Sequence, residues 1–212
     1  MPTSTAISAQ GSTFSIEGTP GSALTITGIT KAASAVVTAA NTLAIGDVVE
    51  FGTVTGMPEI YGLLGVVTAT GGGTTFTCNI DSSGFATVGT AGTANPKTWT
   101  AIGNVKDFSG FDGTVSELDK TNLQSGAMEY AAGLQDFGNF SLNIDIDDTD
   151  AGHIALRAAK TAASTKAFKL RLPNGKLRVF KAFVKKFGES GGVNAIHKGN
   201  TDLRITGVVN YA

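Results

Sequence analysis

The densest group of residues that could do chemistry is a run of carboxylates at Asp145, Asp147, Asp148 and Asp150. Calcium is bound by several carboxylate oxygens, so a calcium site is one interpretation of this run. The run departs from the loop pattern Asp-x-Asp/Asn-x-Asp/Asn-Gly-x5-Glu, because Thr149 stands at its fifth position. Asp145 and Asp147 suit the polar face of a strand, whereas Asp148 and Asp150 suit the positive start of a helix. We therefore expect no metal site and no cofactor.

The other candidates for catalysis are Cys78, His153 and His197. Sequence order alone does not exclude a Ser-His-Asp arrangement, but the chain has no Gly-x-Ser-x-Gly elbow. Cys78 is the one cysteine, so it forms no internal disulfide, and no nucleophile signature surrounds it. His153 falls in the first turn of an expected helix and His197 in a Gly/Asn-rich loop. We expect both histidines at the surface, and we expect no enzyme.

Basic side chains gather in the C-terminal third, at Lys176, Arg178, Lys181, Lys185 and Lys186. Phe180, Phe183 and Phe187 lie between them, which is one pattern of nucleic-acid binding. A solvated strand face with the phenylalanines in the core is the alternative that we favour. The net charge of −1, with 16% charged residues, also argues against a protein that grips phosphates.

The composition indicates a β-rich chain with many turns. Thr and Val favour pleated surfaces, and the 28 glycines, against 5 prolines, suit the turns between strands. Met1–Ala6 has neither the basic nor the apolar part of a signal peptide, and no apolar run is long enough for a membrane helix. Only residues Gly11–Gly18, with Phe14 and Ile16 on one side, suggest a strand near the N-terminus.

The C-terminal half contains the clearest strands. Phe140, Leu142, Ile144 and Ile146 alternate with Ser141, Asn143, Asp145 and Asp147, a period of two that predicts one apolar and one polar face. Pro173-Asn174-Gly175 predicts a turn between strands that start near Phe168 and Lys176. The apolar phase slips within Leu177–Phe187, which predicts a bulge or bend near Phe180. Leu203–Tyr211 predicts a last strand.

One helix is expected over Asp148–Lys160. Asp148 or Thr149 can cap its first turn, and Lys160 suits its negative C-terminal end. Its apolar face would consist of Ala151, Ile154, Ala155 and Ala158, which recur at helical spacing.

Residues 21–95 differ in composition from the rest of the chain: they contain few charged residues and several short runs of β-forming residues. The expected strands are Ala23–Ile29, Ala35–Thr38, Asp47–Phe51, Gly65–Thr70 and Thr74–Ile80. Gly71–Gly73 between two of them predicts a hairpin; a phosphate-binding loop is the alternative, but no Gly-Lys-Ser/Thr follows. Gly84–Pro96 is small and polar and predicts a linker.

The segment Ile102–Val209 resembles the major tail tube proteins of siphophages, including the lambda-type tail protein. The resemblance is carried, in order, by Val105-Lys-Asp-Phe-Ser-Gly110, Glu117-Leu-Asp-Lys-Thr121, Met128-Glu-Tyr-Ala-Ala-Gly-Leu-Gln-Asp-Phe-Gly-Asn-Phe-Ser-Leu142, Asp148-Thr-Asp-Ala-Gly152 and Leu170-Arg-Leu-Pro-Asn-Gly-Lys-Leu-Arg-Val-Phe-Lys-Ala-Phe-Val-Lys-Lys-Phe-Gly188. Each piece is common by itself. Their order over about half of the chain makes the resemblance specific.

The resemblance implies a β-sandwich with one flanking helix, six copies of which join their sheets into a ring. Rings would stack into the tube of a long non-contractile tail, assembled in the host cytoplasm and part of the virion. Closure removes the unpaired sheet edges of a lone subunit. The implied partners are other copies of the chain, a tape measure protein and a tail terminator. DNA would pass through the lumen during infection without sequence-specific binding, and no membrane is involved.

Two segments are implied as assembly elements. The long stretch Leu118–Leu134 would be a loop that reaches the neighbouring ring, as loops of this length in compact domains are usually functional. Its candidate anchors are Leu118, Leu123, Met128 and Tyr130. The N-terminal arm, anchored by Phe14 and Ile16, would become ordered on assembly. The candidate wall of the lumen is the polar face Ser141, Asn143 and Asp145, since a neutral or weakly acidic wall does not retain phosphates.

Residues 24–94 look like a small β-barrel-like module of phage proteins, similar to a domain of ubiquitin-activating enzymes. Ile26-Thr-Gly-Ile-Thr30, Ile45-Gly-Asp-Val-Val49, Gly56-Met-Pro-Glu-Ile-Tyr-Gly62 and Asp81-Ser-Ser-Gly-Phe85 carry this similarity, without any ubiquitin chemistry. We thus expect a discontinuous tube domain, 1–20 and 97–212, with an inserted module, 21–96, that projects outward and is dispensable for the tube. No immunoglobulin-like domain is expected after Ala212, unlike in the lambda-type protein.

Two other functions remain open. One is another tail component with the same fold, such as a contractile-tail inner tube or a tail terminator. The other is a carbohydrate-binding β module, for which Tyr61, Trp99, Tyr130 and Tyr211 would have to supply aromatic platforms.

Overall fold

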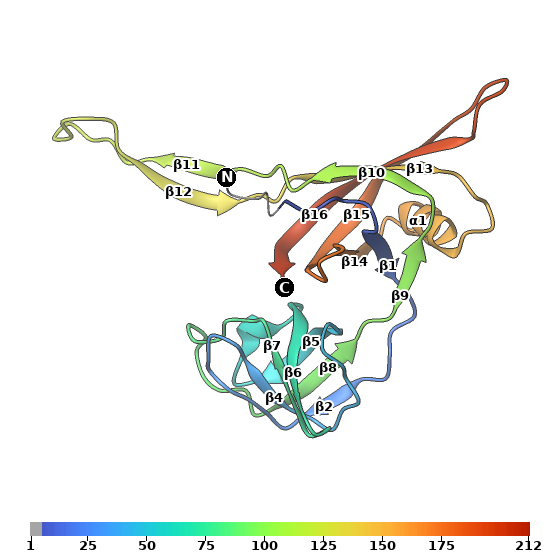
Figure 1. The fold of residues 1–212 in the computed structure, drawn as a ribbon. Coiled ribbons are helices and arrows are strands. Elements are labelled where there is room, and N and C mark those ends of the chain that lie inside the picture. The colour runs from blue at the N-terminus through green and yellow to red at the C-terminus, as the bar shows by residue number, and fades with distance from the viewer. Residues whose placement is uncertain (1–5) are drawn as a thin grey trace, which may run out of the picture. The chain divides into compact units, whose positions relative to one another are not determined.

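The computed structural model describes residues 6–212 and shows a mainly β protein with one α-helix, which confirms the expected fold class (Figure 1). The described chain divides into two compact units. The first runs up to Ile102 and includes Ala167–Phe180 and Asn210–Ala212; the second comprises Gly103–Lys166 and Lys181–Val209. The expected boundary around an inserted module at 21–96 is a different division and stays a prediction.

The larger sheet has seven strands, in the order β10-β13-β16-β15-β14-β1-β9. These strands are β1 (Thr13–Glu17), β9 (Trp99–Ile102), β10 (Val105–Gly110), β13 (Asn139–Asp145), β14 (Thr165–Arg171), β15 (Leu177–Ser190) and β16 (Lys198–Tyr211). The sequence order β9, Gly103, Asn104, β10 means that the two edge strands follow each other in the chain.

Strand β13 has the alternation that its sequence predicts. Phe140, Leu142 and Ile144 are buried, and the strand pairs with β10 on one side and β16 on the other. The Pro-Asn-Gly turn between β14 and β15 is also confirmed: Gly175 has φ +83° and its N–H donates to the carbonyl of Leu172 at 2.9 Å.

Strand β15 confirms the predicted slip of apolar phase. Val179 and Phe180 are consecutive and both buried, after which Ala182 and Val184 point inward. The expectation that Phe183 belongs to the core is wrong, because this side chain is 39% exposed. It lies between two inward-facing residues of a pleated strand and therefore points outward.

The helix α1 (Ala151–Thr161) forms where expected, but with a different cap and a different buried face. Its N-cap is Asp150 rather than Asp148 or Thr149, and the Asp150 carboxylate accepts the His153 N–H at 2.9 Å. The buried side is Gly152, His153, Leu156 and Ala159, whereas Ile154 of the expected face is 51% exposed. Two stripes at helical spacing exist in this segment, and the one containing histidine is the one that packs.

A second sheet of seven strands is built from residues 24–96, in the order β2-β8-β5-β6-β7-β4-β3. Its strands are β2 (Leu24–Ile26), β3 (Gly28–Ile29), β4 (Val36–Thr38), β5 (Val48–Thr55), β6 (Leu64–Gly71), β7 (Thr75–Cys78) and β8 (Ala91–Pro96), with a short 3-10 helix at Pro58–Ile60. Four of the five expected strands are present, whereas the expected strand Ala23–Ile29 is divided into β2 and β3, which pair with β8 and β4 respectively. Gly72 and Gly73 form the predicted β6–β7 turn with positive φ.

The linker expected at Gly84–Pro96 is wrong for its second half, because Ala91–Pro96 is strand β8. This strand pairs with both β2 and β5. Its small residues allow the strands to approach closely: a Cβ on Gly92 would lie 2.6 Å from the Thr53 carbonyl oxygen. The glycine is a packing requirement, not a sign of an unstructured chain.

Strand β1 lies inside the larger sheet, paired with β14 and β9. Phe14 and Ile16 are 3% and 1% exposed, and the Phe14 ring stacks on Phe168 with the ring centres 5.7 Å apart. Both side chains are therefore buried within a single chain, where they hold β1 in the sheet, and the ordering of an N-terminal arm on assembly stays a prediction.

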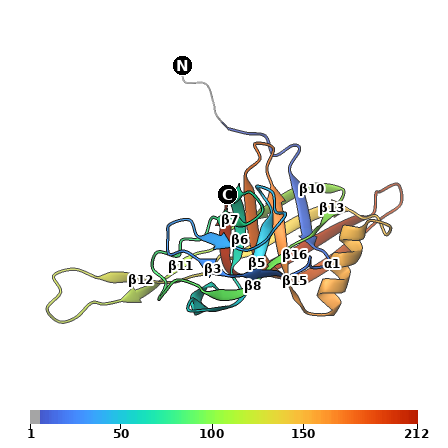
Figure 2. The ribbon, with the colours of Figure 1, turned by 90° about the horizontal axis from the view of Figure 1, so that it is seen from below.

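The stretch Leu118–Leu134, expected as an unpatterned loop, lies within a β-hairpin of β11 (Val115–Asp119) and β12 (Tyr130–Gln135). These two strands pair only with each other, as a separate two-stranded sheet. Figures 1 and 2 show the hairpin extending well beyond β10 and β13.

Candidate assembly surfaces

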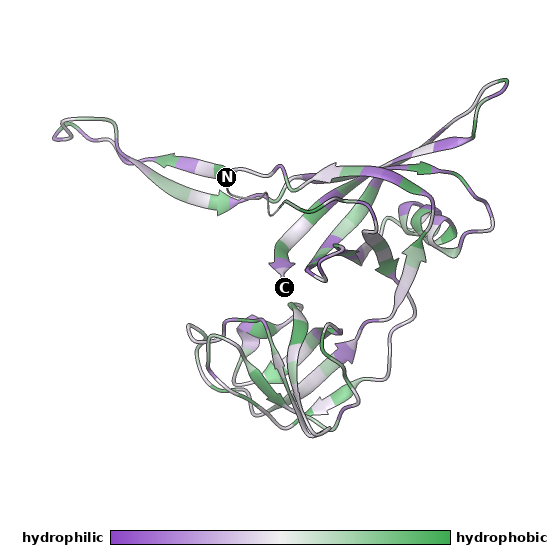
Figure 3. Ribbon diagram, viewed as in Figure 1, coloured by the Kyte–Doolittle hydropathy of each residue, from purple (hydrophilic) through white to green (hydrophobic). Residues whose placement is uncertain are grey.

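The β11–β12 hairpin carries apolar side chains that contact solvent. Figure 3, which colours the ribbon by hydropathy, shows hydrophobic segments in green along this hairpin. These are Val115, Leu118, Leu123, Met128, Tyr130 and Leu134. Leu123, at the tip, is fully exposed, and no residue of β11 is buried. The four predicted anchors thus lie on one hairpin, which also carries the exposed Val115 and Leu134.

The tip of this hairpin is held by polar contacts. Lys120 N–H donates to the Glu129 carbonyl at 2.8 Å, and Glu129 N–H donates to the Thr121 hydroxyl at 3.0 Å. Hydrogen bonds from the Thr121 side chain and backbone hold the pKa of Asp119 below its ordinary value. The tip therefore has a defined conformation although its apolar side chains are exposed to solvent.

An isolated two-stranded hairpin is at best marginally stable in water, and exposed apolar surface of this kind marks a protein interface. The geometry suits a contact with another protein surface rather than a reaction, because the hairpin presents apolar side chains without a cleft.

The polar face of β13 is the second candidate surface. Ser141 Oγ donates to Asp202 at 2.7 Å, Asn143 Nδ2 donates to Asp107 at 2.7 Å, and Lys106 Nζ lies 2.7 Å from the Asp145 carboxylate. The three predicted lumen residues thus sit on one face, tied to β10 and β16.

A pocket of about 730 Å³ opens on this face. Its charged lining residues are Lys106, Lys186 and Lys198 together with Asp107, Asp145 and Glu189. Three cations balance three anions, so the surface is polar without being strongly positive. A surface of this type repels and attracts phosphate groups about equally.

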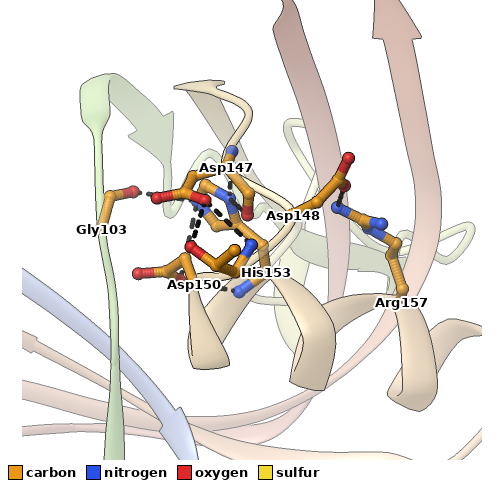
Figure 4. Close-up of polar contacts among 7 residues, drawn as sticks. Gly103, Asp147, Asp148, Asp150, His153 and Arg157 are labelled. Atoms are coloured by element: carbon orange, nitrogen blue, oxygen red, sulfur yellow. Dashed lines mark hydrogen bonds and ion pairs between the residues drawn. The ribbon is translucent and has the colours of Figure 1, made fainter.

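The acidic run expected to serve a strand and a helix start is divided among separate partners (Figure 4). Asp147 accepts from the backbone and hydroxyl of Thr149, and these hydrogen bonds hold its pKa below the ordinary value. Asp148 pairs with Arg157, and Asp150 caps the helix. Within residues 6–212 no three Asp, Glu, His or Cys residues are grouped as metal ligands.

The surface position expected for His153 is wrong, since the residue is 0% exposed. Asp147 N–H donates to Nδ1 at 3.1 Å, and Nε2 lies 3.0 Å from the carbonyl oxygen of Gly103. The neutral tautomer with its proton on Nε2 makes both bonds. Both ring nitrogens are therefore used in holding the backbone. His197, in contrast, is exposed as expected, 3.4 Å from Glu189.

A second exposed apolar tip, between β15 and β16, was not identified from the sequence. Val193 is 96% and Ile196 61% exposed in the connection 191–197. The available signal was a pair of branched apolar residues within a segment otherwise rich in Gly and Asn.

Two of the aromatic residues considered as sugar platforms are each covered by a basic side chain. Lys169 Nζ lies over the Trp99 ring at 4.7 Å, and the Arg178 guanidinium lies over Tyr211 at 4.6 Å. Burial lowers the pKa of Lys169. Tyr61, in the turn after the 3-10 helix, and Tyr130, the first residue of β12, remain exposed.

Comparison with known families and structures gives one family model. Residues 85–178 match the model described as phage tail tube, TTP, lambda-like, a family of structural, non-enzymatic proteins. The matched segment contains the whole of the β11–β12 hairpin, β13 and α1. The curated proteins contain no match.

Solved structures that match part of the chain include the following two. One is a chain from the virion of a native gene transfer agent particle, with a TM-score of 0.47, 14% identity, and coverage of 54% of this chain and 88% of that chain. The other belongs to the baseplate of the anti-feeding prophage, with a TM-score of 0.43, 12% identity, and coverage of 54% and 84%. Over residues 6–212, none of the helical structure is both long and apolar enough to cross a membrane.

Proposed function

We propose that this chain is the subunit of a phage tail tube, in which copies of the chain stack through the β11–β12 hairpin. The observation that carries the proposal is that this exposed apolar hairpin lies inside the segment, 85–178, that matches the tail tube family. A partner surface would cover side chains such as Leu123 and Met128, which water surrounds in a lone chain.

In the finer form of the proposal, six copies form a ring, and rings stack into the tube of a long non-contractile tail. The tube domain would comprise 1–20 and 97–212, with 21–96 inserted and on the outer side. The tape measure protein and the tail terminator would be its partners in the virion, and assembly would take place in the host cytoplasm. Ring closure would remove the free edge of β10 or β9.

The lumen wall in this proposal is the face of Ser141, Asn143 and Asp145. Support comes from the polar network and from the balance of three cations and three anions around it. Double-stranded DNA would pass such a wall during ejection without being retained. DNA binding is driven by lysine and arginine side chains that replace the counterions of the phosphates, and the lysines of this wall are balanced by carboxylates.

The test is to purify the full chain and follow its assembly by light scattering and negative-stain electron microscopy. Long hollow tubes without added proteins support the proposal. Single rings that never stack would point instead to a terminator, and a protein that stays monomeric at high concentration would overturn the tube function.

A further inference from the structure

Residues 21–96 contact the rest of the first compact unit through buried side chains, a feature that the tube function does not require. Inside the first compact unit, a buried apolar cluster joins β5 and β6 to β14 and β15. Its buried members are Val48, Leu64, Val66, Ala167, Leu177 and Val179. We name this cluster the junction. None of its members is more than 7% exposed, and Trp99 and Ala212 pack at its rim.

The strands on the module's side of the junction are buried on both faces where they contact it, at Val48–Val49 of β5 and Val66–Val67 of β6. Val48 belongs to the junction while its neighbour Val49 belongs to the module's own core, and Val66 and Val67 divide in the same way. Neighbouring residues of a strand point to opposite faces. A module that stood free in solvent would carry polar residues at positions 48 and 66, as solvated sheet faces do.

Side-chain hydrogen bonds cross the junction at its edge. Asn210 Nδ2 donates to the carbonyl oxygen of Leu64 at 2.8 Å, and Asn79 Nδ2 donates to that of Tyr211 at 3.4 Å. The end of the chain is fixed there as well, because Leu177 and Ala212 exchange both backbone hydrogen bonds. The junction therefore combines apolar packing with hydrogen bonds, which fix the orientation of the two parts that meet there.

Three charged residues also link β1 to β5 within the first unit. Lys97 Nζ lies 2.6 Å from Glu17 Oε1, on β1, and 2.5 Å from Glu50 Oε2, on β5. Glu17 Oε2 also accepts the N–H of Ala167 at 2.9 Å. The Lys97 side chain is only 6% exposed, so losing a partner would leave a charge in a poorly hydrated place.

We propose that residues 21–96 are a fixed cover over the apolar surface of β14 and β15, and that the cover and these strands fold as one cooperative unit. The cover is then not the dispensable attachment that its sequence suggested. Removing it takes away Val48, Leu64 and Val66, which are buried together with Leu177 and Val179 in the junction.

Two probes already in the chain test this without altering it. Trp99, the only tryptophan, lies at the junction, and Cys78, the only cysteine, lies in the module's own core. In a urea titration, Trp99 fluorescence, Cys78 labelling and far-UV circular dichroism should share one midpoint. A separate, earlier or later midpoint for Cys78 would overturn the proposal.

A matched pair of variants in the full chain separates the junction from the module's surface. Val66→Asp introduces a charge into the junction, whereas Ile45→Asp does so where the side chain is already 70% exposed. V66D should lower the midpoints of all probes together, and I45D should leave them unchanged. If V66D lowers only the Cys78 midpoint, the two parts fold independently.

The last experiment deletes residues 22–95 and joins the ends with a short Gly/Ser bridge. The deleted chain should bind the dye ANS and aggregate, and Leu177→Thr with Val179→Thr in the same chain should reduce the dye binding at least severalfold. A deleted chain that is soluble and binds no more dye than the full chain would contradict the proposal. None of these results depends on whether tubes form.

Discussion

Nε2 of the buried His153 lies 3.0 Å from the carbonyl oxygen of Gly103, the residue that precedes the corner into β10. The opposite ring nitrogen accepts the N–H of Asp147 at 3.1 Å. The His153 side chain of α1 therefore holds two backbone segments: Gly103, just before the edge strand β10, and Asp147, just after β13. In a tube, the position of that edge would decide whether a neighbouring subunit can pair with it.

Replacing His153 with Phe should destabilise the fold by about 2–4 kcal/mol, because two buried backbone groups lose their partners while the ring volume is kept. Urea unfolding followed by circular dichroism measures the change. His197→Phe is the matched control and should stay within about 0.5 kcal/mol, since that ring is about half exposed. Equal, small effects of the two variants would show that the His153 bonds contribute little.

The helix illustrates what the sequence can and cannot predict. Its place and length follow from the acidic start and the alanine-rich run, but its buried face does not. Counting apolar residues selects the stripe of Ile154, whereas the protein buries the stripe of His153 and Leu156. A histidine becomes a core residue only when backbone partners, here Gly103 and Asp147, lie at the right places, and those come from distant parts of the chain.

Lys97 should make stability depend on pH at the alkaline end. Burial by itself lowers the pKa of Lys97, but hydrogen bonds and charges from Glu17 and Glu50 outweigh it, so the pKa lies above its ordinary 10.5. A raised pKa gives stability that is complete below the ordinary value and is lost as the pH rises through the folded-state value. Wild type should therefore exceed Lys97→Met in unfolding free energy up to about pH 10.5, and the difference should shrink above it.

The control for this pH profile is Lys176→Met, which removes an exposed lysine from the β14–β15 turn. Its unfolding free energy should run parallel to wild type from pH 8 to pH 12. If the difference in unfolding free energy between wild type and K97M stays constant through this range, the ion pairs of Lys97 with Glu17 and Glu50 do not cause the pH dependence.

Cys78 should be unreactive in the folded protein. Burial raises the pKa of its thiol to about 11, so at pH 8 the group is protonated as well as covered. Labelling with a chromogenic disulfide should be at least about 100-fold slower in buffer than in strong urea, because it must await opening of the module. Rapid labelling of the native protein would show that the core around Cys78 opens easily.

Strand β8 and the β11–β12 hairpin show where local patterns fail. Ala91–Pro96 has no alternation and small side chains, so it resembles a linker, yet its strand partners need those small residues for close approach. The hairpin has no buried face from which a period of two could arise. In both places the strand is determined by pairing with another strand, which a local pattern does not record.

The hairpin's role in stacking is tested by Leu123→Ser combined with Met128→Ser. Both side chains are exposed, so the melting temperature of the single chain should barely change, while tube formation should fall sharply because the apolar contact is lost. Gln124→Ser at the same tip is the control and should assemble normally. Sedimentation and negative-stain images give the readout. Tubes of normal length from the double variant would contradict stacking through this tip.

Asp145 tests the assignment of the lumen. Its carboxylate neutralises Lys106 at 2.7 Å, and Lys198 is its direct partner in the pairing of β13 with β16. Asp145→Lys would place three ammonium groups close together, and phosphates would be retained by such a wall. Tails assembled from this variant should deliver DNA more slowly, and the defect should weaken as the salt concentration rises. Asp145→Asn, which removes the charge without reversing it, should have a smaller effect. Unchanged delivery by intact D145K tails would place this face away from the DNA, and the wall would then have to be sought on another face of the sheet.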